Sequence, residues 1–183
     1  MLPSPLKRVH AGLLGLGICL GAMVSAAVLR AQNADPGGAA PGGVEVIGSP
    51  DGRTIVTVRP QGTAATRQGL RQFVGISAAN SGARGLSMNR VVIPPGGRAA
   101  PHRHVGSESA IYLLQGTVET RYGERLERRV VNRSGDFLFI PPGVPHQPIN
   151  VSATEPAIAI VARNDPQEQE HVELVDPPGT LQP

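Results

Sequence analysis

Histidines with the spacing of metal ligands stand in two glycine- and proline-rich stretches of the chain. His102 and His104 are two residues apart, so on an extended strand both imidazoles project from the same face. Glu108 follows shortly after them, and His146 lies in a turn region that comes after the apolar run 136–140. Three imidazoles and a carboxylate suit iron, manganese, nickel, copper or zinc better than magnesium or calcium. We therefore predict one divalent transition metal ion held by these four side chains.

The two stretches resemble the two sequence motifs of the cupin superfamily. The first family motif has glycine, five residues, His-x-His, three or four residues, glutamate, six residues and glycine, and Gly96 to Gly116 follow it with one discrepancy. The second has glycine, five residues, Pro-x-Gly, two residues, histidine, three residues and asparagine, and Gly135 to Asn150 match it at every spacing. The resemblance covers residues 91–162. It implies an all-β fold, the double-stranded β-helix or jelly-roll barrel of cupins.

The discrepancy concerns the carboxylate. Counted forward from His104, Glu108 obeys the three-residue spacing, but counted back from Gly116 the expected position holds Ser109. Side chains alternate between the two faces of a strand, so Glu108 and Ser109 cannot both face the barrel on a regular strand. A bulge, or a Glu108 in the loop before the strand, would let its carboxylate reach the metal. We expect Glu108 to be the fourth ligand; the alternative is an exposed carboxylate beside three histidines.

By resemblance, three classes of function compete. A metal-dependent enzyme of dioxygenase, decarboxylase or lyase type would act on a small organic substrate, with Glu108 as a ligand or as the group that takes a proton. A non-catalytic protein would hold a small ligand in the barrel, with the metal as its anchor. A sugar isomerase or epimerase would use a histidine and a tyrosine, for which Tyr112 is the candidate. The ligand types favour the enzyme, with iron or manganese preferred and nickel, copper or zinc as alternatives.

Side chains near the predicted ligands receive structural roles in this interpretation. Arg103 is expected to point away from the metal, and Tyr112 to pack in the core of the sandwich. Gln147 and Asn150 either orient a ligand imidazole or stabilise the turn. His171 stands outside both motifs and is expected on the surface. The phenylalanines of the predicted strands are expected to pack in the interior: Phe73, Phe137 and Phe139.

Composition limits the partners. The chain has 183 residues, enough for one domain with a sizeable core. Its net charge of +3 comes from Lys7, Arg8 and Arg30, because from residue 31 onward 14 arginines are balanced by 14 acidic residues. No nucleic-acid partner is therefore expected. An aromatic content of 3% favours a compact cavity for a small molecule.

The N-terminus has the layout of a secretory signal peptide. The pair Lys7-Arg8 precedes the uncharged run 11–29, and small residues stand where a signal peptidase would cut, after Ala26 or Ala27. We predict a signal peptide at 1–27 and export to the periplasm or out of the cell. The alternative is an uncleaved N-terminal membrane anchor, which would be the chain's only contact with a membrane.

Short runs rich in β-branched residues alternate with turns along the rest of the chain, a pattern typical of sandwiches and barrels. The predicted strands are 44–47, 53–58, 70–77, 86–93, 109–115, 118–122, 128–132, 137–140, 157–162 and 171–175. The sequence has no internal repeat, which predicts a single cupin domain at 44–176, between a flexible linker at 28–43 and a loose tail at 177–183. Strands before residue 91 are candidates for edge pairing in a homodimer.

Overall fold

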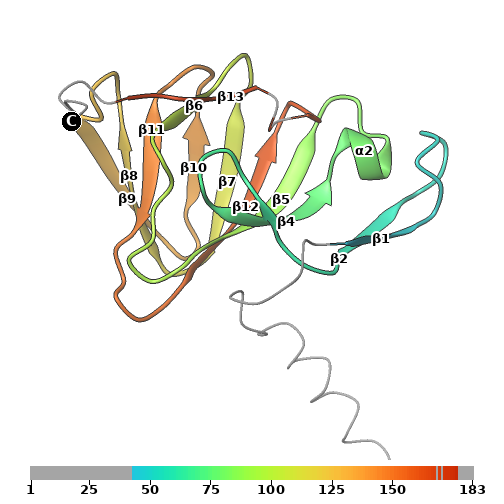
Figure 1. The fold of residues 1–183 in the computed structure, drawn as a ribbon, viewed down its shortest axis with the longest axis horizontal. Coiled ribbons are helices and arrows are strands. Elements are labelled where there is room, and N and C mark those ends of the chain that lie inside the picture. Colours follow the sequence, from blue (N-terminus) through green and yellow to red (C-terminus); the bar gives the residue numbers. More distant parts are fainter. Residues whose placement is uncertain (1–42, 168, 170, 177–183) are drawn as a thin grey trace, which may run out of the picture. The chain divides into compact units, whose positions relative to one another are not determined.

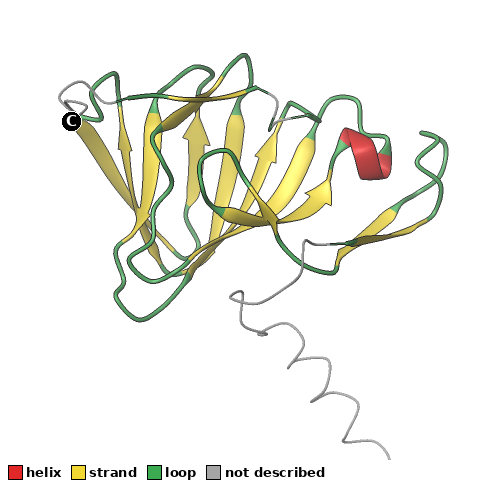
Figure 2. Ribbon diagram, viewed as in Figure 1, coloured by secondary structure: helices red, strands yellow, loops and turns green. Residues whose placement is uncertain are grey.

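The computed structural model describes residues 43–167, 169 and 171–176, which form an all-β fold with one short helix (Figure 1, Figure 2). The prediction of an all-β jelly-roll fold is confirmed. The predicted signal segment (1–27), almost all of the predicted linker (28–43) and the predicted tail (177–183) lie outside the described residues. Within the described residues, no helix has the length and apolar character needed to cross a membrane.

Two large antiparallel sheets carry most of the chain. The six-stranded sheet has the spatial order β10 (Phe137–Ile140), β7 (Ser109–Gln115), β12 (Ala157–Arg163), β5 (Ser87–Ile93), β4 (Arg71–Ile76) and β3 (Ala64–Ala65). The five-stranded sheet has the order β13 (Val172–Leu174), β6 (His102–His104), β11 (His146–Asn150), β8 (Thr117–Tyr122) and β9 (Arg128–Arg133). Six of the nine neighbouring strand pairs join strands that are not consecutive in the chain, so the chain crosses between the sheets repeatedly.

The core lies between the two sheets, because alternate residues of each strand face inward. On β7, Ser109 and Leu113 are buried while Ala110 and Leu114 are exposed. Full burial of one such aliphatic side chain stabilises the fold by roughly 1.5–3 kcal/mol. Both sheets and the loops between them contribute to the buried apolar cluster, which consists of Leu70, Ile93, Ala99, Leu113, Val118 and Ala157.

A glycine carries the chain from one sheet to the other between β7 and β8. Gly116 has φ +88°, and a Cβ atom built on it would lie 2.9 Å from Cα of Ala157. Glycine is needed here for two reasons, the left-handed backbone and the close approach of β12. This turn places the end of the first motif directly against the six-stranded sheet.

A separate hairpin precedes the two sheets in the chain. Strands β1 (Val44–Ile47) and β2 (Thr57–Pro60) pair in antiparallel register. They correspond to the predicted strands 44–47 and 53–58, of which the second begins later than predicted, at Thr57. Helix α2 (Ala78–Ser81) lies between the predicted strands 70–77 and 86–93. Its capping box at Ser77 and the left-handed Gly82 that ends it account for the single helical turn.

Two phenylalanines contradict their predicted packing. Phe137 and Phe139 are 80% and 59% exposed. The strand β10 is short, and its inward positions are taken by Leu138 and Ile140, so alternation turns both aromatic rings outward. Phe73 is partly buried, and the guanidinium carbon of Arg90 lies 3.9 Å from its ring centroid.

Candidate metal centre

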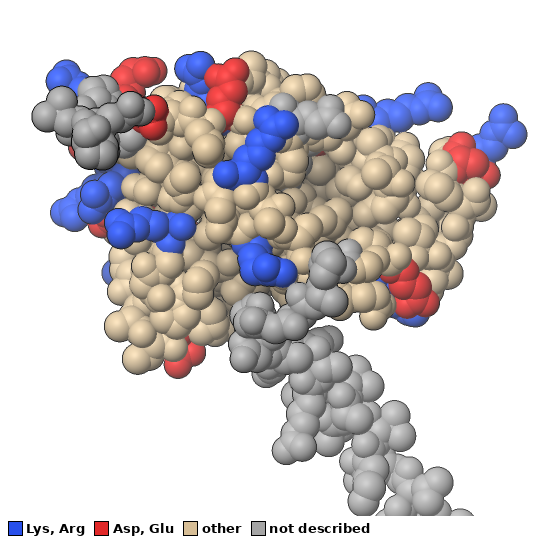
Figure 3. Space-filling view, viewed as in Figure 1, with Lys and Arg blue, Asp and Glu red and all other residues tan. Residues whose placement is uncertain are grey.

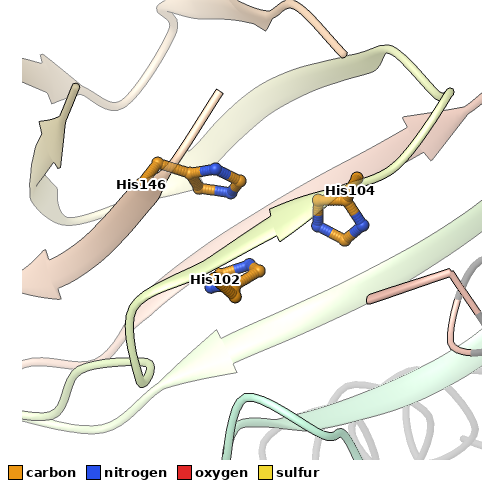
Figure 4. A group of neighbouring side chains, drawn as sticks. All are labelled: His102, His104 and His146. Carbon is orange, nitrogen blue, oxygen red and sulfur yellow. The ribbon is translucent and has the colours of Figure 1, made fainter. Parts of the chain in front are cut away.

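Three histidines of the five-stranded sheet converge on one point (Figure 4). In the antiparallel ladder, His102 of β6 stands directly opposite His146 of β11, and His104 lies two residues further along β6. Each of the three rings offers a nitrogen within 4.8 Å of the nitrogens of the other two. Strand alternation therefore produces the shared face that the His-x-His spacing predicts.

The rings of this cluster are close and almost fully buried. The centroid of His102 lies 5.1 Å from that of His104 and 4.3 Å from that of His146, and the remaining pair is 5.6 Å apart. All three residues are less than 5% exposed. Metal–nitrogen bonds of about 2.1 Å require ligand nitrogens about 3–3.5 Å apart, so small ring rotations would complete the geometry.

Local backbone contacts orient two of the rings. Nδ1 of His102 lies 2.8 Å from the carbonyl oxygen of Ala100, and Nδ1 of His146 lies 2.9 Å from that of Val144. A carbonyl oxygen only accepts, so Nδ1 must carry the proton and donate it. The lone pair is thereby assigned to Nε2 of both rings, which is the arrangement that a metal-binding histidine requires.

The third ring supplies the test of whether these residues fit a metal. Both ring nitrogens of His104 are buried, and neither has a hydrogen-bond partner among the described residues. A buried polar atom left without a partner costs about 1–3 kcal/mol. A cation bound at the cluster would satisfy one of these nitrogens, so the side chains fit a metal ion.

Burial keeps the three imidazoles neutral. It is the main cause that lowers the pKa of His102 to about 3, of His104 to about 2 and of His146 to about 4. The positive charge of Arg163 lowers all three pKa values further. Neutral imidazole is the form that binds a metal, so protons do not compete for these nitrogens near neutral pH.

The structure does not bring Glu108 to the cluster. Glu108 is exposed, precedes the first residue of β7, and donates its backbone N–H to Oδ1 of Asn164 at 2.8 Å. Ser109 begins the strand and is 1% exposed, so alternation directs its side chain inward. The count back from Gly116, and not the count forward from His104, therefore identifies the inward-facing position. As a fourth ligand, Glu108 stays a prediction that this geometry does not favour.

Arg163 is a site residue that the sequence analysis misses. It ends β12, is 8% exposed, and donates Nε–H to Oγ of Ser109 at 3.0 Å. The two residues are direct partners in the ladder between β12 and β7. The predicted strand stops at residue 162, one position too early. The alternation of side chains could have identified Arg163, because it lies on the same side of the strand as Ala159 and Val161.

A cavity between the sheets adjoins the cluster. Its volume is about 80 Å³, and its walls are mainly aliphatic side chains of both sheets. His102, His146 and Arg163 line it, together with the buried Gln68, whose Oε1 has no hydrogen-bond partner among the described residues. An engineered apolar cavity of roughly 150 Å³ holds benzene, so this space suits a ligand of only a few non-hydrogen atoms.

Asn150 and Gln147 hold loops and not imidazoles. Nδ2 of Asn150 donates to the carbonyl oxygens of Ile93 and Pro94, both at 3.1 Å, and of Glu155 at 2.8 Å. Nε2 of Gln147 donates to the carbonyl oxygen of Ala99 at 2.8 Å. Of the two roles left open for these residues, the structure supports the one that stabilises turns.

The remaining predicted neighbours lie away from the three rings. Arg103 points outward and forms an ion pair with Glu173, with 2.7 Å between Nη2 and Oε2. The partly buried Tyr112 packs against the exposed Phe137, with ring centroids 4.6 Å apart, so it does not join the histidines as an isomerase would require. His171 is exposed, as expected, and its Nδ1 lies 2.7 Å from Oδ2 of Asp165. On the face drawn in Figure 3, basic and acidic side chains are interspersed.

Comparisons with known sequences identify a family domain in the part of the chain that contains the three histidines. A family profile described as a cupin domain matches residues 89–163. A germin-like protein, subfamily T member 3, of Arabidopsis thaliana is 34% identical over 114 residues, which are 60% of this chain and 47% of the relative. An oxalate oxidase of Triticum aestivum is 31% identical over 110 residues, or 57% of this chain and 46% of the relative. The chain thus spans about half the length of the curated relatives that it matches.

Comparisons with solved structures agree with the fold. The oxalate decarboxylase of Lactobacillus farciminis has a TM-score of 0.53 at 22% identity, over 62% of this chain and 33% of that protein. A polyketide cyclase of Streptomyces resistomycificus has a TM-score of 0.50 at 23% identity, over 61% of this chain and 74% of that protein. Two facing sheets, converging histidines and a matching family profile lead to one conclusion: residues 89–163 of the chain form a domain of the cupin superfamily.

Proposed function

We propose that His102, His104 and His146 bind one divalent transition metal ion, and that the chain is a metal-dependent enzyme acting on a small organic substrate. The observation that carries the proposal is the convergence of three buried, neutral imidazoles at the wall of a small cavity. Such an arrangement leaves coordination positions for a substrate, unlike a closed structural site. The reaction class is that of a dioxygenase, decarboxylase or lyase.

The donor set narrows the choice of metal. Imidazole nitrogens suit iron, copper, nickel and zinc, whereas manganese prefers carboxylate oxygens. With Glu108 outside the cluster, the donors favour iron over manganese, and leave nickel, copper and zinc as alternatives. A bound ion would supply Lewis acidity or redox chemistry. The chain's own residues would hold that ion, keep the imidazoles neutral and exclude bulk water with the aliphatic walls.

Relatives support an enzyme that acts on a small acid. An oxalate oxidase is among the similar sequences, and an oxalate decarboxylase shares the fold. The cavity of about 80 Å³ has room for a substrate of that size class. The alternative is a protein that holds such a ligand without converting it, which the small cavity would also allow.

Metal analysis of the purified protein tests the proposal. We expect about one iron, or another of these transition metals, per chain by inductively coupled plasma mass spectrometry. His146→Ala should lose this metal, and the matched variant His171→Ala should keep it, because His171 lies on the surface. Folded wild-type protein that takes up none of these metals would overturn the proposal.

Activity and simple binding are separated by one incubation. The metal-loaded protein is mixed with a panel of small organic acids under air, and oxygen consumption, carbon dioxide release and product formation are followed. An enzyme converts at least one acid, and the His146→Ala variant does not. A ligand that binds and is recovered unchanged would favour the non-catalytic alternative.

We also propose export of the chain, on the N-terminal sequence alone. The uncharged run 11–29 after Lys7-Arg8 supports a cleavable signal. Expression of the full chain followed by intact mass measurement should yield a mature protein that begins at residue 27 or 28. A full-length mass in a membrane fraction would instead support the uncleaved anchor.

A further inference from the structure

A row of side chains on the inner face of the five-stranded sheet runs away from the histidines. His102 of β6 stands opposite His146 of β11, and His146 in turn stands opposite Tyr122 of β8. Directly opposite residues of an antiparallel pair point to the same face and lie about 5 Å apart at Cα. Alternation along β8 agrees, because Val118 and Thr120 are buried and Tyr122 is the next residue on their side. Tyr122 therefore shares the inner face with the metal ligands.

A second, larger cavity opens beside this row. Its volume is about 740 Å³, within the range of about 300–1,000 Å³ that is usual for ligand pockets. Its walls come from β8, β9, β10 and the loop at 141–145, and β9 and β10 are edge strands of the two sheets. Both Tyr122 and His146 line it. The candidate metal centre thus has an open side, where the edges of the two sheets face each other.

The larger cavity adjoins the small one at the histidines. Four residues line both cavities: Thr120, Leu138, Ile140 and His146. The small cavity has room for only a few non-hydrogen atoms, whereas the larger one has room for a ring. A ligand whose reacting group lies at the histidines would therefore extend its remaining atoms past Tyr122 and into the larger cavity.

The walls of the larger cavity suit an apolar group. Its charged side chains are exposed, and two of them pair with each other, because Nε of Arg128 lies 3.9 Å from Oε1 of Glu127. The less exposed part of the wall is mostly apolar and includes Val130, Leu138, Ile140, Val144 and Pro145. A second charged group of the ligand would lose hydration against this wall without gaining a partner. Tyr122 adds an aromatic ring at the end nearest His146, and aromatic rings pack well against each other.

We propose that the larger cavity binds the apolar part of the substrate, and that Tyr122 is the residue that determines specificity for a planar ring there. The proposal rests on the proposed metal site, where the polar reacting group of the substrate would lie. It narrows the substrate class to small organic acids that carry an apolar ring. The contact of Tyr122 with that ring, and the depth of the cavity at Val130, are the two features that tests can change.

Titration of the cobalt(II)-loaded protein tests the role of Tyr122 without any measurement of activity. Acetate and phenylacetate share a carboxylate and differ by one phenyl ring. Both are expected to change the visible spectrum of the cobalt site, and the Kd of phenylacetate should be at least about 10-fold lower, because its ring is buried. Tyr122→Ala should reduce this preference to less than about threefold with unchanged cobalt content, whereas Tyr122→Phe, which keeps the ring, should retain it. Tyr112→Ala is the matched control and should keep the full preference, because Tyr112 packs against the exposed Phe137 instead.

A second pair of variants tests the cavity itself. Val130 of β9 stands opposite Thr120 and lines the larger cavity, whereas the next residue, Val131, points to the other face and is 42% exposed. Val130→Phe would fill the cavity, so it should raise the Kd of phenylacetate at least about 10-fold and leave that of acetate unchanged. Val131→Phe adds the same side chain on the opposite face and should change neither Kd.

Cobalt content separates this inference from the metal site. If cobalt binds but phenylacetate is not preferred over acetate, the inference fails and the metal site stands. The same holds if the preference survives Tyr122→Ala or Val130→Phe in protein whose circular dichroism shows it to be folded. Equal affinity of the cobalt-free protein for phenylacetate would also overturn the inference, because the cavity would then bind the ring independently of the metal. If cobalt does not bind to the wild type, the proposed function fails and the inference fails with it.

Discussion

The two sheets of this barrel present opposite chemistry to the same cavity. The five-stranded sheet contributes three uncharged nitrogen donors, from β6 and β11. The six-stranded sheet contributes a cation, Arg163, held by the hydroxyl of Ser109. The difference teaches that the neutral donors and the buried cation belong to separate walls of the cavity, so they come together only when the two sheets have packed.

The walls also differ in how their side chains are held. His102 and His146 are oriented by carbonyl oxygens two residues earlier in the chain, at Ala100 and Val144. Nε–H of Arg163 donates to a residue 54 positions away, Ser109. Two of the donors are therefore oriented by local chain geometry, whereas this hydrogen bond of the cation forms only when β7 and β12 have paired.

Removal of one of the three histidine ligands should have the largest effect, a loss of metal binding. His104→Ala deletes the third nitrogen, and the described residues offer no replacement near it. We expect the metal content to fall from about one per chain to below about one-tenth, with affinity at least about 100-fold weaker than in the wild type. Mass spectrometry of the metal and a competition titration would measure both. Retention of full metal content would show that the ligands lie elsewhere.

Acid should destabilise the metal-free protein through the donor wall. Unfolded histidines bind protons near pH 6.5, but burial lowers the folded pKa values to about 4, 3 and 2. The unfolded state therefore binds more protons between these limits, so stability falls as the pH falls from 7 to 4, by up to ~1 kcal/mol per pH unit for each histidine. Denaturant titrations at several pH values would measure this.

The control for the acid effect is a variant in which the three histidines are changed together to glutamine. Its stability should vary less between pH 7 and pH 4, because the groups with displaced pKa values are gone. Equal pH dependence in the two proteins would assign the acid sensitivity to other groups.

The turn that joins the walls should be the next most sensitive point. Gly116→Ala forces a Cβ atom to within 2.9 Å of Cα of Ala157 at φ +88°, whereas Gly135→Ala at φ +96° meets no atom within 4 Å. We expect losses of about 3 and about 1 kcal/mol, because the second variant has backbone strain alone. Urea unfolding would measure the difference. Equal losses would show that the close approach of β12 contributes nothing.

The smallest effect should follow from Glu108→Gln. Glu108 is exposed and outside the cluster, so metal affinity should change less than about twofold. A change of Arg103, which is also exposed and pairs with Glu173, should have an equally small effect. The same competition titration would measure it. A loss of metal binding comparable to that of His104→Ala would restore Glu108 as a ligand, and would mean that the loop before β7 rearranges on binding.

Local patterns predict much of the fold. Strands β7 and β10 have the predicted bounds, and the motif spacings identify the three histidines that converge. The alternation of side chains also predicts correctly that only one of Glu108 and Ser109 faces inward. These features depend on residues within one strand, where periodicity suffices.

Features that depend on cross-strand partners escape the sequence analysis. Strand β11 is taken for a turn because three prolines and a glycine stand just before His146, and only pairing with β8 makes it extended. Phe137 is expected to be buried but is exposed. Pairing with β7 decides which side chains of the short strand β10 face inward, and the sequence of β10 alone does not reveal this. Arg163 is missed because a charged residue after an apolar run indicates the end of a strand. Only the pairing of Arg163 with Ser109 shows that the strand continues through it.

The ladder between β6 and β11 is joined through a single residue pair, His102 opposite His146. A metal bound to both would cross-link the two strands that share the fewest residue pairs in the five-stranded sheet. The backbone amides of β6 and of the neighbouring β13, which pairs with β6 over three residues, would then exchange with solvent more slowly in the loaded protein than in the metal-free one. The ion would thus stabilise the pairing of β6 with β11, in addition to any role in chemistry.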